Sequence, residues 1–143
     1  MATSAKQLAV KLLARREHSA AEIRQKLQQR EFSSSEIDEV VVELQKGDWL
    51  SDERFTEAYI RSRRLKGFGP VRIAVELRER GVDETLVSRY LLADDEVWVQ
   101  TMREEYQRKY RGTSYEDYQE KAKRMRFLQY RGFPLDKIHE VVK

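Results

Sequence analysis

The chain repeats itself at an interval of about fifty residues, and this period limits the folds it can adopt. Segment 18–32, HSAAEIRQKLQQREF, aligns with 68–82, FGPVRIAVELRERGV, at a shift of 50, and a further shift of 51 brings in 123–133, KRMRFLQYRGF. The matched positions include Ile23 with Ile73, Leu27 with Leu77 and Leu128, and Arg30 with Arg80 and Arg131. A repeat of this length predicts an array of similar units that share a continuous core.

Each unit is expected to contain three helices. Apolar residues recur at three- and four-residue spacing, and the chain has only two prolines and six glycines to interrupt helices. We therefore predict an all-α fold, an elongated, curved array of three tandem three-helix repeats at 1–50, 51–93 and 94–143. A unit this small cannot bury its apolar face alone, so neighbouring units must pack together.

Capping signals mark the expected helix starts. Ser19–Glu22 and Ser33–Glu36 are capping boxes, and Gly69-Pro70 and Asp83 suit the starts of two helices in the central unit. The third unit is predicted to open near Asp94, Asp95 and Glu96, with Thr113 or Ser114 capping its second helix. In the central unit, the helix 52–65 should bury one face made of Phe55, Ala58, Tyr59, Ser62 and Leu65.

Composition limits where the protein works. Hydrophobic residues form 40% of the 143, charged residues form 37%, and no long apolar run is present, so we expect no membrane span. The first sixteen residues contain Lys6 and Lys11 within their short apolar stretch, which indicates an amphipathic helix rather than a signal peptide. The lack of cysteine suits the cytosol. We expect a cytoplasmic protein.

The motifs of common enzymes are missing from the sequence. It contains neither a G-x-x-x-x-G-K-[ST] loop nor a G-x-S-x-G elbow, and 67–69 is only a G-x-G without a preceding strand. The two histidines, His18 and His139, lie in different units, so a metal site is not indicated and His18 is expected to cap or pack locally. The acidic pairs at 94–95 and 104–105 are interpreted as N-terminal charge and solvated helix surface. We predict no enzyme activity and no cofactor.

Basic clusters recur at the end of the first helix of successive units. Because equivalent positions of a repeat array lie along one edge, they predict one basic edge rather than separate patches. Such an edge could neutralise phosphates or contact an acidic protein surface, and each cluster could also be half of a mixed-charge helix surface. The candidate binding residues are Arg15, Arg16, Arg61, Arg63, Arg64, Lys66, Arg72, Arg108, Lys109, Arg111, Lys121, Lys123, Arg124 and Arg126.

Three stretches carry a resemblance to a known family. They are LLARREHSAAEIRQKL (12–27), GDWLSDERFTEAYIRSRRLKGFGPVRIAVELRERGV (47–82) and KAKRMRFLQYRGF (121–133). In series, R-R-E-H-S, L-x-D-x-R-F and K-G-x-G-P-x-R-I-x-x-E-L make the chain similar to the RecX family of bacterial recombination regulators.

The resemblance implies a function that composition alone does not. Members of the family are built of tandem three-helix repeats, and they bind in the groove of the RecA filament on single-stranded DNA. There they inhibit ATP hydrolysis, co-protease activity and strand exchange, and some also bind DNA. The implied partners are therefore the RecA filament and single- or double-stranded DNA, with no membrane contact, and the protein is expected to be a monomer. The alternative is a helical repeat module that binds DNA or RNA directly.

One position departs from the family pattern. Glu31 stands where the other two units have glycine, which predicts a less tight turn after the second helix of the first unit.

Overall fold

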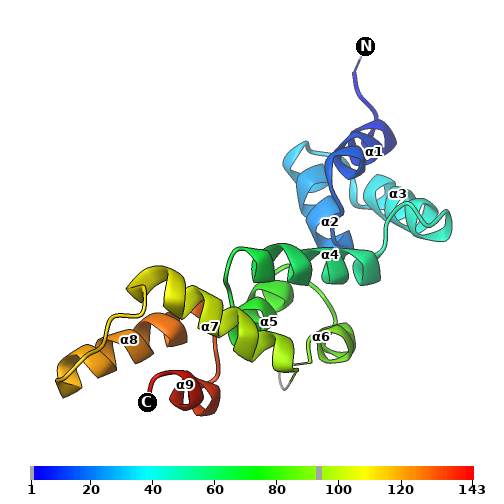
Figure 1. Ribbon diagram of the computed structural model, residues 1–143. Helices are drawn as coiled ribbons and strands as arrows, with labels where there is room; N and C mark the ends of the chain where they lie inside the picture. The colour runs from blue at the N-terminus through cyan, green and yellow to red at the C-terminus, as the bar shows by residue number, and fades with distance from the viewer. Residues whose placement is uncertain (1, 93–94) are drawn as a thin grey trace. The chain divides into compact units, whose positions relative to one another are not determined.

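The computed structural model describes residues 2–92 and 95–143, and all regular structure in those residues is helical (Figure 1). The all-α prediction of three helices in each of three tandem units is thus confirmed. The predicted start of the third unit at Asp94 lies outside the described residues. The helices are α1 Ala5–Arg15, α2 Ala20–Gln29, α3 Ser34–Lys46, α4 Asp52–Leu65, α5 Pro70–Glu79, α6 Glu84–Tyr90, α7 Glu96–Tyr110, α8 Tyr118–Arg131 and α9 Leu135–Val141. No helix among the described residues is long and apolar enough to cross a membrane.

Local capping explains where the helices of the first repeat begin. Ser19 and Ser33 accept the backbone N–H groups of Glu22 and Glu36, and both glutamates return a hydrogen bond, so the two predicted capping boxes are confirmed. A third box opens α1, where Ser4 Oγ accepts the N–H of Gln7 at 3.1 Å.

The prediction that Thr113 or Ser114 caps the second helix of the third repeat is wrong. Asp117 is the N-cap of α8, and its carboxylate accepts the N–H of Glu120 at 2.7 Å. The Thr113 hydroxyl instead donates to the carbonyl of Tyr110 at 2.7 Å, which closes the turn after α7.

The chain forms two compact units, which differ from the three repeats because the central repeat is divided between them. The first contains the residues up to Tyr59 together with Leu77–Val87. Here α1, α2 and α3 pack on one another around a core of buried apolar side chains. That core contains Ala5, Ala9, Ile23, Leu27, Ile37, Val40, Val41, Leu44 and Leu50.

The second unit contains 60–76 and the residues from Ser88 onward. Within it α9 packs against both α7 and α8. Its buried apolar side chains include Trp98, Val99, Met102, Leu128, Phe133, Ile138 and Val142.

Two members of the predicted buried face of α4, Ser62 and Leu65, are exposed. Phe55 is buried, but Leu65 at the end of the helix is 72% exposed, so that assignment is wrong. At about 3.6 residues per turn, ten residues rotate Leu65 by roughly 80° away from Phe55 around the helix. A step of three residues falls short of a full turn, so a series made mostly of such steps drifts off the face that contains Phe55.

The turn after α2 is as tight as its two counterparts, contrary to the prediction from Glu31. Glu31 has a φ of 65°, in the same left-handed region as Gly81 at 79° and Gly132 at 101°. In each turn the next residue's N–H returns to a carbonyl five residues earlier, as from Phe32 to Leu27 at 3.3 Å. The first repeat therefore keeps the glycine geometry with a glutamate, at a conformational cost.

Candidate interaction surface

Two of the motifs that carry the family resemblance, R-R-E-H-S and L-x-D-x-R-F, meet inside the first unit. The Asp52 carboxylate accepts the N–H of Ala20 at 2.7 Å, at the N-terminus of α2. The Arg54 guanidinium pairs with Glu17, with 3.2 Å between Nε and Oε2. These residues therefore hold the start of α2 against the start of α4, and their role is structural.

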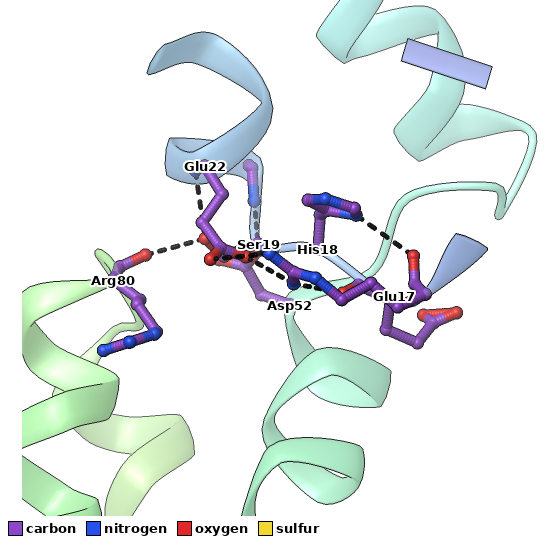
Figure 2. Close-up of polar contacts among 8 residues, drawn as sticks. Glu17, His18, Ser19, Glu22, Asp52 and Arg80 are labelled. Carbon is purple, nitrogen blue, oxygen red and sulfur yellow. Dashed lines mark hydrogen bonds and ion pairs between the residues drawn. The ribbon is translucent and has the colours of Figure 1, made fainter. Parts of the chain in front are cut away.

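Ser19 adds a second connection at the same corner (Figure 2). Its side chain is buried, accepts the N–H of Glu22 at 3.1 Å and donates to the carbonyl of Arg80 at 2.7 Å. A Cβ on Gly81 would overlap the Cβ of Ala21, so the two backbones approach too closely for a side chain. The start of α2 is thus joined to the turn after α5.

His18 lies at this corner and is buried, at 3% exposure. Its Nδ1 is 3.0 Å from the carbonyl oxygen of Arg16. Burial lowers the pKa of His18 below its ordinary value of 6.5, and the positive charge of Arg16 lowers it further. The predicted local packing role is confirmed. Within residues 2–92 and 95–143, no group of three histidine or acidic side chains is placed to hold a metal.

The same joint recurs in the second unit, between α5 and the turn after α8. Gly69 N–H donates to the carbonyl of Arg131 at 2.8 Å, and Val71 N–H donates to that of Gly132 at 2.9 Å. A Cβ on Gly132 would overlap Arg72, and one on Gly69 would meet the backbone of Gly132. The G-x-G at 67–69 is therefore a site of close backbone contact, as the end of one helix and the start of the next.

Guanidinium groups surround one aromatic ring beside this joint. The ring centroid of Phe68 lies 3.9 Å from Arg63, 4.5 Å from Arg72 and 5.0 Å from Arg131, each measured to Cζ. Glu76 accepts two bonds from Arg63, both 2.9 Å, and one from Arg72 at 3.3 Å. Arg63 and Arg72, both predicted to bind a partner, thus have their charge engaged within the fold.

The interpretation of 104–105 as solvated helix surface holds for Glu104 and is wrong for Glu105. Glu105 is 5% exposed, and its carboxylate lies 2.6 Å from Arg108 and 3.6 Å from Arg131. It also occupies the space a side chain on Gly67 would need. Glu105 is therefore a buried acid that pairs with Arg108 and Arg131, whereas Glu76 pairs with Arg63 and Arg72.

Arg124 is the most deeply buried of the candidate binding residues. It is 3% exposed, and its guanidinium donates to the Tyr106 hydroxyl at 2.9 Å and to the Thr113 carbonyl at 2.8 Å. Glu120 pairs with it at 3.3 Å. Arg124 binds the loop between α7 and α8, so we leave it out of the interaction surface.

The other candidates differ in how available their charge is. Arg16 pairs with Glu22 at 3.2 Å, and Lys109 Nζ lies 4.5 Å from the ring centroid of Phe127. Arg64 and Lys121 are half-buried. The exposed candidates that form no ion pair with the described residues are Arg15, Arg61, Lys66, Lys109, Arg111, Lys123 and Arg126. That these form one continuous edge stays a prediction.

Two features were missed by the sequence reasoning. Tyr130 on α8 is 74% exposed, with the guanidinium of Arg72 5.0 Å from its ring centroid. Lys11 and Arg30 converge with Arg15 on a pocket of the first unit. The alignment of Arg30 with Arg80 and Arg131 in the repeat singles out Arg30 in the sequence. It does not show that Arg30 lies beside Lys11 and Arg15.

Tandem three-helix units without strands in the described part define the chain as an all-helical repeat protein. Family models for the first, second and third three-helix domains of RecX match residues 5–44, 51–91 and 95–142. The chain belongs to the RecX family of regulatory proteins.

Individual relatives support this assignment. The chain is 38% identical over 141 residues to the regulatory protein RecX of Legionella pneumophila, covering 99% of this chain and 94% of the relative. It is 40% identical over 130 residues to that of Pseudomonas putida, covering 91% and 83%. The crystal structure of RecX from Lactobacillus salivarius superposes with a TM-score of 0.79 at 23% identity, covering 96% of this chain and 92% of that one.

Proposed function

We propose that the protein is a negative regulator of the RecA recombinase, which binds the RecA filament on single-stranded DNA and inhibits ATP hydrolysis, co-protease activity and strand exchange. The family assignment supports this, because it extends over all three repeats and its curated members are named regulatory proteins. We further propose that it acts as a cytoplasmic monomer whose repeats are bounded at 1–50, 51–93 and 94–143.

The observation that carries the proposal is the cationic end of α4. Arg63 is engaged by Glu76, but no ion pair is recorded for Arg61, Arg64 and Lys66 within the described part of the chain. These like charges repel one another, and the helix dipole at the C-terminal end of α4 offsets only part of that repulsion. An acidic protein surface would compensate them and would be attracted at long range.

The test is the single-stranded-DNA-dependent ATPase of RecA, measured with increasing amounts of this protein at a fixed excess of DNA. We expect inhibition at substoichiometric protein despite the excess, because the target is the filament. If added DNA removes the inhibition completely, the protein merely competes for DNA and the proposal is wrong.

A charge-reversal variant locates the contact. Arg61→Glu, Arg64→Glu and Lys66→Glu together should raise the half-inhibitory concentration by about tenfold or more, since each exposed pair contributes about 0.2–1 kcal/mol and reversal adds repulsion. The matched control reverses Lys26, Lys46 and Arg89, which are exposed outside the candidate surface. Equal effects of both variants, at unchanged helicity by circular dichroism, would exclude the end of α4.

Direct nucleic-acid binding is the second candidate, favoured by the exposed ring of Tyr130. An exposed aromatic ring on the same helix as the exposed Arg126 provides stacking and charge for a single strand. Fluorescence anisotropy with labelled oligo-dT, in the absence of RecA, measures this directly. A Tyr130→Ala variant that binds the oligonucleotide as well as the parent protein would refute stacking at this residue.

A further inference from the structure

A pocket on the first unit lies between α1 and the end of α2. It has a volume of about 270 Å³ and is lined by Leu8, Lys11, Leu12, Arg15 and Arg30. Leu8 and Leu12 are half-buried and pack on the core of the unit, while the three basic residues are exposed. An apolar floor is thus surrounded by three positive charges.

These charges lack compensation from the rest of the described chain. No ion pair is recorded for Lys11, Arg15 or Arg30, although the same unit contains several acidic side chains that pair elsewhere. Arg15 and Arg30 stand at the C-terminal ends of α1 and α2, where the helix dipole offsets part of their repulsion. A bound anionic group would compensate these positive charges.

The size and lining of the pocket decide between ligand classes. Small-molecule sites usually occupy about 300–1,000 Å³, so this pocket suits a single side chain better than a whole ligand. Its floor consists of leucine side chains and no aromatic ring lines it, so a nucleic-acid base has nothing to stack on. A carboxylate-rich peptide that inserts one apolar side chain satisfies both the floor and the rim.

We propose that this pocket binds a short acidic peptide segment of a partner protein, with one leucine or phenylalanine on the floor and flanking carboxylates paired to Lys11, Arg15 and Arg30. The inference rests on the proposed function in one respect, because it assigns the segment to the protein that forms the filament. It adds a second contact, on the first unit, to that at the end of α4. Two weak contacts on one chain increase the overall affinity by avidity.

The experiment is a fluorescence anisotropy titration of the full chain with a labelled peptide of aspartate and glutamate around a central Leu-Phe pair. A second peptide has Ser-Ser in place of Leu-Phe, and a labelled oligo-dT of similar charge is the nucleic-acid probe. The double variant Lys11→Gln, Arg15→Gln should bind the Leu-Phe peptide about tenfold more weakly. The control Lys26→Gln, Lys46→Gln removes the same charge from the same unit and should bind it as the parent does.

Three results would refute the proposal that the pocket binds an acidic peptide. They are equal weakening by both double variants, equal affinity for the Ser-Ser peptide, and a loss of oligo-dT binding that matches the loss of peptide binding. Thermal melting of the variants distinguishes a structural role, because cations needed at helix ends would lower Tm when removed, whereas a ligand site leaves Tm unchanged or higher. Inhibition of the RecA ATPase without peptide binding would refute the peptide site and leave the proposed function intact. Peptide binding without inhibition would refute the proposed function and leave the peptide site intact.

Discussion

Replacing Glu31 by glycine should stabilise the protein, although it removes a side chain. Glu31 has a φ of 65°, whereas its counterparts in the other two repeats are Gly81 and Gly132. The left-handed conformation costs a residue with a Cβ about 1–2 kcal/mol, and glycine avoids this cost.

The magnitude is the balance of three effects. Relief of the backbone conformation contributes about 1–2 kcal/mol, and the greater freedom of glycine in the unfolded chain takes back about 0.5–1 kcal/mol. Glu31 follows α2 directly, so removing its negative charge from the C-terminal end of that helix adds about 0.3 kcal/mol. The expected gain is about 1 kcal/mol, which raises Tm by about 4 °C.

The assay is urea unfolding followed by circular dichroism, with two comparison variants. Glu31→Ala removes the charge but keeps the Cβ, so it should give less than half of the gain. Gly81→Ala introduces a Cβ at a φ of 79°, and in a space already occupied by Ala21, so it should lose about 2 kcal/mol or more. If Glu31→Ala stabilises as much as Glu31→Gly, the charge is the cause and the conformational argument is refuted.

Two further variants test buried groups. Arg124→Met should lower the free energy of unfolding by about 3 kcal/mol, because it leaves Glu120 and the Thr113 carbonyl without their partner; urea unfolding that matches the parent protein would contradict this. Because the folded pKa of His18 is lowered, the unfolded chain binds the proton first, so stability should fall as the pH drops through about 6.5. His18→Gln should flatten the pH dependence of the unfolding free energy, whereas a similar flattening in the exposed His139→Gln control would assign it elsewhere.

Many charged residues in the family-like motifs build the joints between repeats. Asp52 accepts a hydrogen bond from the start of α2, and Arg54 forms an ion pair with Glu17. Glu76 forms ion pairs with Arg63 and Arg72 beside the ring of Phe68. A charged motif in this chain therefore indicates in the first place how one repeat is attached to the next. The residues available for a partner are those that the joints leave unpaired.

The sequence by itself determined the helices, the repeat and the caps at Ser19 and Ser33. Helix periodicity and the boxes at Ser19 and Ser33 depend on residues three or four positions apart, so the information is local and readable without the fold. The order of the three-helix repeats followed from the fifty-residue period, because similar segments can be aligned without knowing their contacts.

Only the tertiary structure decided which charges are available to a partner. Lys123 and Arg124 are neighbours in one basic run, yet Lys123 is exposed and Arg124 is buried against the loop after α7. Glu105 became a buried acid because Arg131, distant in sequence, folds back onto it. Such pairings depend on contacts between residues far apart along the chain, and no local pattern records which side chains will meet.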